Sequence, residues 1–110
     1  MIFDKQDNTT IITQEKVSVI ELVKKLDVLY DRFKNDNVII CLTSLKLIPL
    51  EEIVEFLKIS NTHRQAKNSF VIVTDKVNTD EMPDELVVVP TLQEAYDIIE
   101  MEEMERDLGL

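Results

Sequence analysis

The chain has 110 residues, of which 45% are hydrophobic, and 22 acidic residues outnumber 12 basic ones to give a formal net charge of −10. A surface of this charge repels phosphate backbones and anionic lipid headgroups, so we expect no binding to nucleic acid or to a membrane surface. No apolar run approaches the ~20 residues of a membrane-spanning helix, and the first residues lack the basic start and long apolar stretch of a secretory signal. The length predicts one domain over residues 1–110.

The N-terminal part of the chain predicts a β-hairpin followed by a helix. Residues 2–3 and 9–13 read as two short strands, and the polar residues 6–8 between them are typical of a turn. Ser18 precedes Glu21 by three residues, which is a capping box at a helix start. The residues that then recur at three- and four-residue steps predict one apolar helix face: Val19, Leu22, Val23, Leu26, Leu29, Tyr30 and Phe33.

The middle of the chain predicts a buried strand and a second helix. Residues 38–42 form a continuous apolar run, as expected of a strand that is covered on both faces. Pro49 suits the first position of a helix, and Glu51 and Glu52 then lie in its first turn, where the helix dipole favours negative charge.

The last part predicts two more strands and a final helix. Residues 70–74 and 86–89 are the strands, and an acidic loop with one short turn is expected between them. Thr91 and Glu94 form a second capping box. The inner face of the final helix is predicted to comprise Leu92, Ala95, Tyr96 and Ile99. The whole order predicts an α/β fold with a mixed, mostly parallel sheet of about five strands, covering helices and an initial hairpin.

Single residues exclude several kinds of site. Gly109 is the only glycine, so no phosphate-binding glycine loop can be written and we expect no nucleotide cofactor. Cys41 is the only cysteine and is predicted to be a small buried hydrophobe, which fits a reducing, cytoplasmic setting. His63 is the only histidine, which excludes a histidine-rich metal centre, and we expect it to be solvated on the second helix. The sequence predicts no catalytic residue.

The chain also resembles a known family. An apolar strand and connector, residues 40–48, lead into Pro49-Leu50-Glu51-Glu52-Ile53 at a helix start, and a Pro-Thr-x-x-Glu-Ala helix ends the chain. This order and these lengths resemble the STAS domain (sulphate transporter and anti-sigma factor antagonist), whose small members include bacterial anti-sigma factor antagonists. The resemblance implies a STAS-like fold and a regulatory protein that binds another protein in the bacterial cytoplasm.

The family's phosphorylation motif is absent. Where the family has Asp-Ser-Ser-Gly-Leu, the gapless alignment places Pro49 on the Asp, Glu51 on the phosphorylated second Ser and Glu52 on the Gly. Glu51 is then either a common first-turn residue or a permanently charged, partial stand-in for the phosphorylated serine. Lys46, Pro49, Glu51 and Glu52 are a candidate partner-binding surface.

The acidic C-terminal tail, residues 100–110, provides a second candidate surface. At ~100° per residue, Met101, Met104 and Leu108 lie nearly opposite the inner face of the final helix. With no helix breaker between Glu100 and Leu108, we expect the helix to continue and to present this stripe to a second copy or another protein. A frayed tail without a role is the alternative.

The sequence therefore predicts a non-catalytic protein-interaction module that binds no metal or cofactor. Two alternatives remain: a small enzyme with an unrecognised carboxylate site, and a structural dimer with no regulatory partner. Neither the identity of the partner nor the oligomeric state follows from the sequence.

Overall fold

The computed structural model describes residues 2–14, 18–42, 48–75, 77 and 81–109. The strands are β1 (Ile2–Gln6), β2 (Thr9–Thr13), β3 (Asn37–Cys41), β4 (Phe70–Val73) and β5 (Val87–Val89). The α-helices are α1 (Val19–Leu29), α2 (Leu50–Ile53), α3 (Leu57–Gln65) and α4 (Leu92–Asp107), with 3₁₀ turns η1 (Tyr30–Arg32) and η2 (Val54–Phe56).

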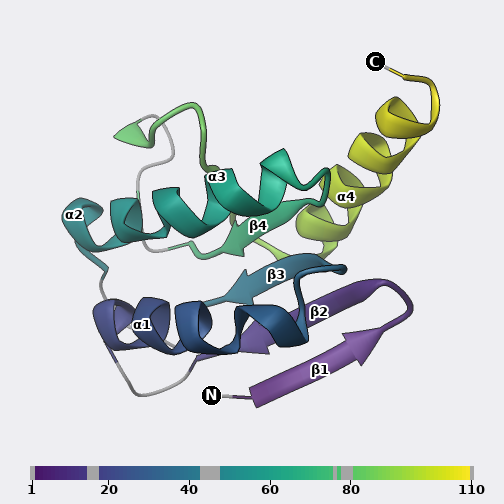
Figure 1. Cartoon of the computed structure of the whole chain (residues 1–110). Helices are drawn as coiled ribbons and strands as arrows, with labels where there is room; N and C mark the ends of the chain where they lie inside the picture. Colours follow the sequence, from purple (N-terminus) through teal and green to yellow (C-terminus); the bar gives the residue numbers. More distant parts are fainter. Residues whose placement is uncertain (1, 15–17, 43–47, 76, 78–80, 110) are drawn as a thin grey trace.

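The described strands form one five-stranded sheet whose spatial order follows the sequence, β1-β2-β3-β4-β5. The first pair is an antiparallel hairpin, and every following pair is parallel. The hairpin turns at Asp7, whose φ of 54° lies in the left-handed region that Asp tolerates better than most residues. The predicted α/β fold, with a mixed sheet and an initial hairpin at one edge, is confirmed (Figure 1).

The two faces of the sheet bury different residues, because successive side chains of a strand point to opposite sides. Ile12, Ile40 and Ile72 are paired neighbours on one face and pack in the larger core with α1 and the α2–α3 segment. Ile39 and Val71 lie on the opposite face, in the cluster that also contains Ala95 and Ile99 of α4. In Figure 1 the sheet separates α4 from the layer that contains α1, α2 and α3.

Both predicted helix caps are present. The Ser18 hydroxyl accepts a hydrogen bond of 3.2 Å from the Glu21 backbone N–H, and the Thr91 hydroxyl accepts one of 3.2 Å from that of Glu94. The second predicted helix differs in detail, because it consists of α2, η2 and α3 in succession. The inner face predicted for the last helix was wrong at Leu92, which is 39% exposed because it lies in the first turn, at the rim of the sheet.

The final helix is longer than the sheet that it covers. At 1.5 Å per residue the 16 residues of α4 span about 24 Å, whereas a five-residue strand at 3.3 Å per residue spans about 17 Å. Because α4 follows β5, it begins near the carboxyl ends of the parallel strands and returns past their amino ends. Its C-terminal half therefore extends beyond the apolar part of the sheet, as the yellow end of the chain in Figure 1 shows.

Candidate interaction surface

The stripe predicted on the last helix is exposed. The helix continues without a break to Asp107, so the predicted continuation past Glu100 is confirmed. Met101 is 49% exposed, Met104 60% and Leu108 73%, whereas Ala95 and Ile99 on the opposite side are buried. One helix thus has a buried apolar side in its N-terminal half and an exposed apolar side in its C-terminal half.

The other predicted surface lies at the start of α2. Pro49 and Glu51 are exposed and Glu52 is half-buried, while Lys46 lies outside the described residues. The Pro49 carbonyl accepts hydrogen bonds from the backbone N–H groups of Glu52 (3.0 Å) and Ile53 (3.2 Å). The proline therefore lies directly before the helix, one residue ahead of the first helical position that the sequence predicted for it.

The structure does not bring these two surfaces together. The helix α2 follows β3 and a connector, so it begins near the carboxyl edge of the sheet, whereas the exposed stripe of α4 runs from Met101 toward the amino edge. Figure 1 shows α2 and the end of α4 at opposite ends of the molecule. A partner that contacts both surfaces at once would have to reach from α2 on one face of the sheet to α4 on the other.

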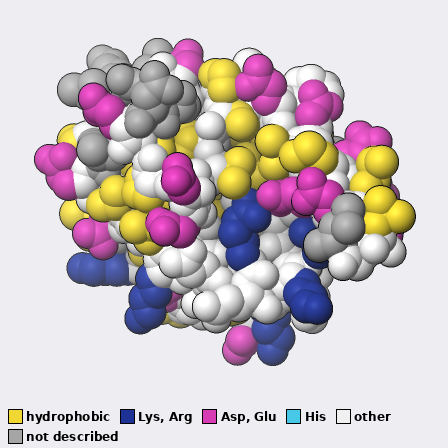
Figure 2. Space-filling view, turned by 90° about the horizontal axis from the view of Figure 1, so that it is seen from above, with side chains coloured by type: hydrophobic (Ala, Val, Ile, Leu, Met, Phe, Trp, Pro, Cys, Tyr) yellow, Lys and Arg dark blue, Asp and Glu magenta, His cyan; other side chains and the backbone are white. Residues whose placement is uncertain are grey.

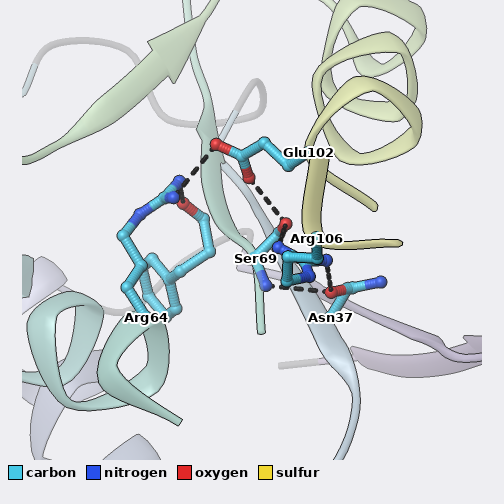
Figure 3. A network of polar contacts seen from close by, with 6 residues as sticks. Asn37, Arg64, Ser69, Glu102 and Arg106 are labelled. Carbon is cyan, nitrogen blue, oxygen red and sulfur yellow. Dashed lines mark hydrogen bonds and ion pairs between the residues drawn. The ribbon is translucent and has the colours of Figure 1, made fainter. Parts of the chain in front are cut away.

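A polar network that the sequence did not predict fixes the C-terminal half of α4 to the domain (Figure 3). Arg64 of α3 donates a 3.0 Å hydrogen bond to one carboxylate oxygen of Glu102 and another, also 3.0 Å, to the Phe70 carbonyl. The second carboxylate oxygen of Glu102 accepts a 2.6 Å hydrogen bond from the hydroxyl of Ser69, which is fully buried.

The same network continues across the amino ends of β3 and β4. Arg106 donates to the Ser69 hydroxyl at 3.2 Å and to the Asn37 side-chain carbonyl at 3.3 Å. Asn37 in turn donates to Glu103, which also accepts a 2.8 Å hydrogen bond from Asn8. We call Asn37, Arg64, Ser69, Glu102 and Arg106 the α4 lock. The lock holds the exposed stripe in place, so the stripe is a preformed helical surface.

His63 belongs to the core, which corrects the prediction of a solvated residue. The side chain is fully buried, and its Nε2–H donates a 2.6 Å hydrogen bond to the Asp36 carbonyl. Nδ1 therefore accepts the 2.8 Å hydrogen bond from the Tyr30 hydroxyl, whose pKa is raised by burial. Burial lowers the pKa of His63, and the neutral imidazole satisfies both partners. The four-residue spacing of Ile59 and His63 places them on one helix face, which is the signal that the sequence prediction overlooked.

Cys41 ends β3 as predicted for a strand residue, but it is half-buried instead of buried. Its strand position is in register with Thr13 and Val73, near the carboxyl edge of the sheet.

The lock borders two polar hollows. One, of about 360 Å³, is lined by Arg64, Lys67, Asn68, Glu102, Glu105, Arg106 and Gly109. Ser69 supplies the hydroxyl of the α4 lock, but it is fully buried between Glu102 and Arg106, so a substrate carbon cannot approach it.

Within the described ranges, no three His, Cys, Asp or Glu side chains are grouped to hold a metal ion. None of the described helices is long and apolar enough to cross a membrane.

Comparison with known proteins supports the fold. No protein-family model matches the chain, and no curated protein does. A solved structure described as the molecular architecture of the stressosome, a signal integration and transduction hub, matches with a TM-score of 0.58 and 15% sequence identity. The match covers 90% of this chain and 96% of that one. At this identity the likeness concerns the fold, which is STAS-like.

Proposed function

We propose that this protein is a non-catalytic interaction module that regulates another protein by binding it through the exposed stripe of α4. The observation that carries the proposal is the stripe itself: Met101 and Met104 are exposed on a helix that the α4 lock ties to the domain, and exposed Leu108 directly follows that helix. Contiguous exposed apolar patches mark interaction sites, and methionines adapt to varied partner shapes.

Two further observations support a binding role in preference to catalysis. The similar solved structure belongs to the stressosome, a signal integration and transduction hub, and this chain shares its STAS-like fold. The side chains of the lock already bond one another, so none of them is placed as a nucleophile with a separate base. We also propose a cytoplasmic location, because a chain with a single cysteine fits a reducing compartment.

The start of α2 is proposed as a second, independent contact. Pro49 and Glu51 are exposed there, and a partner could recognise Glu51 in the position where the STAS family has its phosphorylated serine. Because this position has no hydroxyl, binding at this surface would be constitutive.

A pull-down with matched variants tests the role of the stripe. Wild-type protein, the Met101→Gln/Met104→Gln variant and a Val28→Gln control are used as bait in native lysate of the source cells. Val28 is 83% exposed on α1, on the other side of the sheet, so it controls for the loss of exposed apolar surface. We expect one stoichiometric partner with wild type and with the control, and its loss with the methionine variant. Equal recovery by all three baits, or no partner with any, would refute the proposal.

A further inference from the structure

The charged side chains on the outward side of α4 are all acidic. At ~100° per residue, Glu100 and Asp107 lie on one side of the exposed stripe, and Glu94 and Glu105 lie on the other. Asp97 lies between Glu94 and Met101 on the line of the stripe itself. In Figure 2 the hydrophobic side chains on the right of the face are bordered by acidic ones, while Lys and Arg side chains lie toward the middle and the lower part.

No cation of α4 neutralises these carboxylates. Arg106 is the only basic residue between Leu92 and Leu110. Its guanidinium is turned toward the sheet, where it donates to Ser69 and Asn37. The stripe is therefore apolar at its centre and negatively charged on both sides.

A hollow continues the stripe toward the sheet edge. Val89 of the edge strand β5 lines it together with Ile98 and Met101 of α4, and Glu94 and Asp97 complete the lining. Its volume of about 270 Å³ lies below the ~300–1,000 Å³ of small-molecule pockets. An apolar side chain of a partner, flanked by positive charge, fits this combination of shape and charge.

From this arrangement we infer that the α4 stripe and the adjoining hollow bind a basic amphipathic helix of a different protein. The inference rests on the proposed function and specifies the partner's chemistry. Apolar residues of that helix would contact Met101, Met104 and Leu108, and one of them would enter the hollow beside Val89. Lysine or arginine residues on both sides of its apolar face would pair with Glu100 and Glu105.

Charge argues against a second copy as the occupant. Two α4 stripes packed together would bring the same carboxylates face to face, and like charges in contact oppose association. Each copy also has a formal net charge of −10. A cationic partner instead gains attraction over a distance of about 8 Å at physiological salt.

Direct titration tests this inference with three labelled 18-residue peptides. The first is an amphipathic helix with leucines on one face and lysines elsewhere. The second has glutamates in place of the lysines, and the third has the composition of the first in an order that destroys the apolar face. Binding to the full chain is measured by fluorescence anisotropy at 50 and 150 mM salt.

Paired variants separate a specific site from general attraction to an acidic protein. Glu100→Gln/Glu105→Gln removes two charges beside the stripe, and Asp27→Asn/Glu55→Gln removes two exposed charges from α1 and η2. We expect only the first peptide to bind tightly. We also expect about a tenfold loss with Met101→Gln/Met104→Gln, a smaller loss and a weaker salt dependence with the α4 charge variant, and little change with its control.

Equal binding of the first and third peptides, or equal losses with both charge variants, would overturn the inference. So would sedimentation of the wild type as a dimer that Met101→Gln/Met104→Gln dissociates, because the occupant would then be a second copy. A partner captured through the methionines but insensitive to Glu100→Gln/Glu105→Gln would leave the proposed function standing and refute the basic helix.

Discussion

Arg64 and Glu102 form a 3.0 Å ion pair that joins α3 to the C-terminal half of α4. Their side chains are 26% and 18% exposed, so water screens the pair only in part. Glu102 also accepts the hydrogen bond of Ser69, so one carboxylate connects a helix on one face of the sheet with a strand end and with the helix on the other face. The pair is one of the polar contacts that tie α4 to the domain beyond the region where its apolar side chains pack.

The first prediction concerns the energetic coupling of this pair. Glu102→Gln should lower the free energy of unfolding by about 1–3 kcal/mol, because the guanidinium and the buried serine hydroxyl lose their charged acceptor. Arg64→Met should cost a similar amount. The double variant should cost less than the sum, by at least about 0.5 kcal/mol. Urea denaturation of all four proteins measures the cycle, and strictly additive costs would show that the pair contributes nothing.

The second prediction concerns acid stability. The folded pKa of His63 lies below the ordinary 6.5 because burial disfavours the imidazolium, so the unfolded chain binds the proton more readily. His63 therefore contributes stability above pH 6.5 that is lost as the pH falls from there through the folded pKa. The protonated ring could no longer accept from Tyr30.

Urea denaturation at pH 5.5 and 7.5 checks this sign. As the pH falls from 7.5 to 5.5, wild type should lose more stability than His63→Gln, because the glutamine side chain does not titrate. Lys34→Gln, which removes an exposed partner of Asp31, serves as a control and should keep the wild-type pH dependence. The same pH dependence in wild type and in His63→Gln would show that this histidine does not couple folding to protonation.

The fold could be predicted because each of its sequence signals is contained in a short stretch of the chain. The cap at Ser18, the apolar run before Cys41 and the cap at Thr91 each lie within a few residues, and each appears in the structure. The predicted order of strands and helices also implied a hairpin at one edge of the sheet, where the structure has it.

The α4 lock could not be predicted because its partners are far apart in the chain. Ser69 and Glu102 are 33 residues apart, and Asn37 and Arg106 are 69 apart. A sequence rich in carboxylates does not distinguish Glu102, which faces the sheet, from Glu105, which is exposed. His63 was placed wrongly for a similar reason, since its two hydrogen-bond partners come from another segment of the chain.

The third prediction concerns phosphorylation. Protein isolated from cells should have no phosphate on the segment Pro49–Glu52, because this segment has no hydroxyl side chain. Mass spectrometry of the intact chain and of its peptides tests the wider expectation that the family's phosphorylation site is absent. Stoichiometric phosphate on Thr43 or Ser44, which lie outside the described residues, would instead show that the phosphorylation site is in the connector.

The fourth prediction concerns the tail. Deletion of residues 101–110 should leave the sheet folded, because the buried contacts of α4 are made by Ala95 and Ile99. The deletion also removes Glu102 and Arg106 from buried Ser69, so we expect the Tm to fall by at least about 5 °C. The deletion removes both the exposed stripe and part of the α4 lock. Loss of partner binding in this variant alone would therefore not show which of the two the partner needs.

The fifth prediction makes that separation. Met101→Gln/Met104→Gln changes side chains that are 49% and 60% exposed and keeps every residue of the α4 lock. Glutamine has nearly the same helix propensity as methionine, so the Tm should stay within about 2 °C of wild type. Circular dichroism melts of wild type, the double variant and the deletion give the comparison. A double variant that melts as low as the deletion would mean that the methionines support the core, and the stripe would then be part of the domain's own packing and not a surface for a partner.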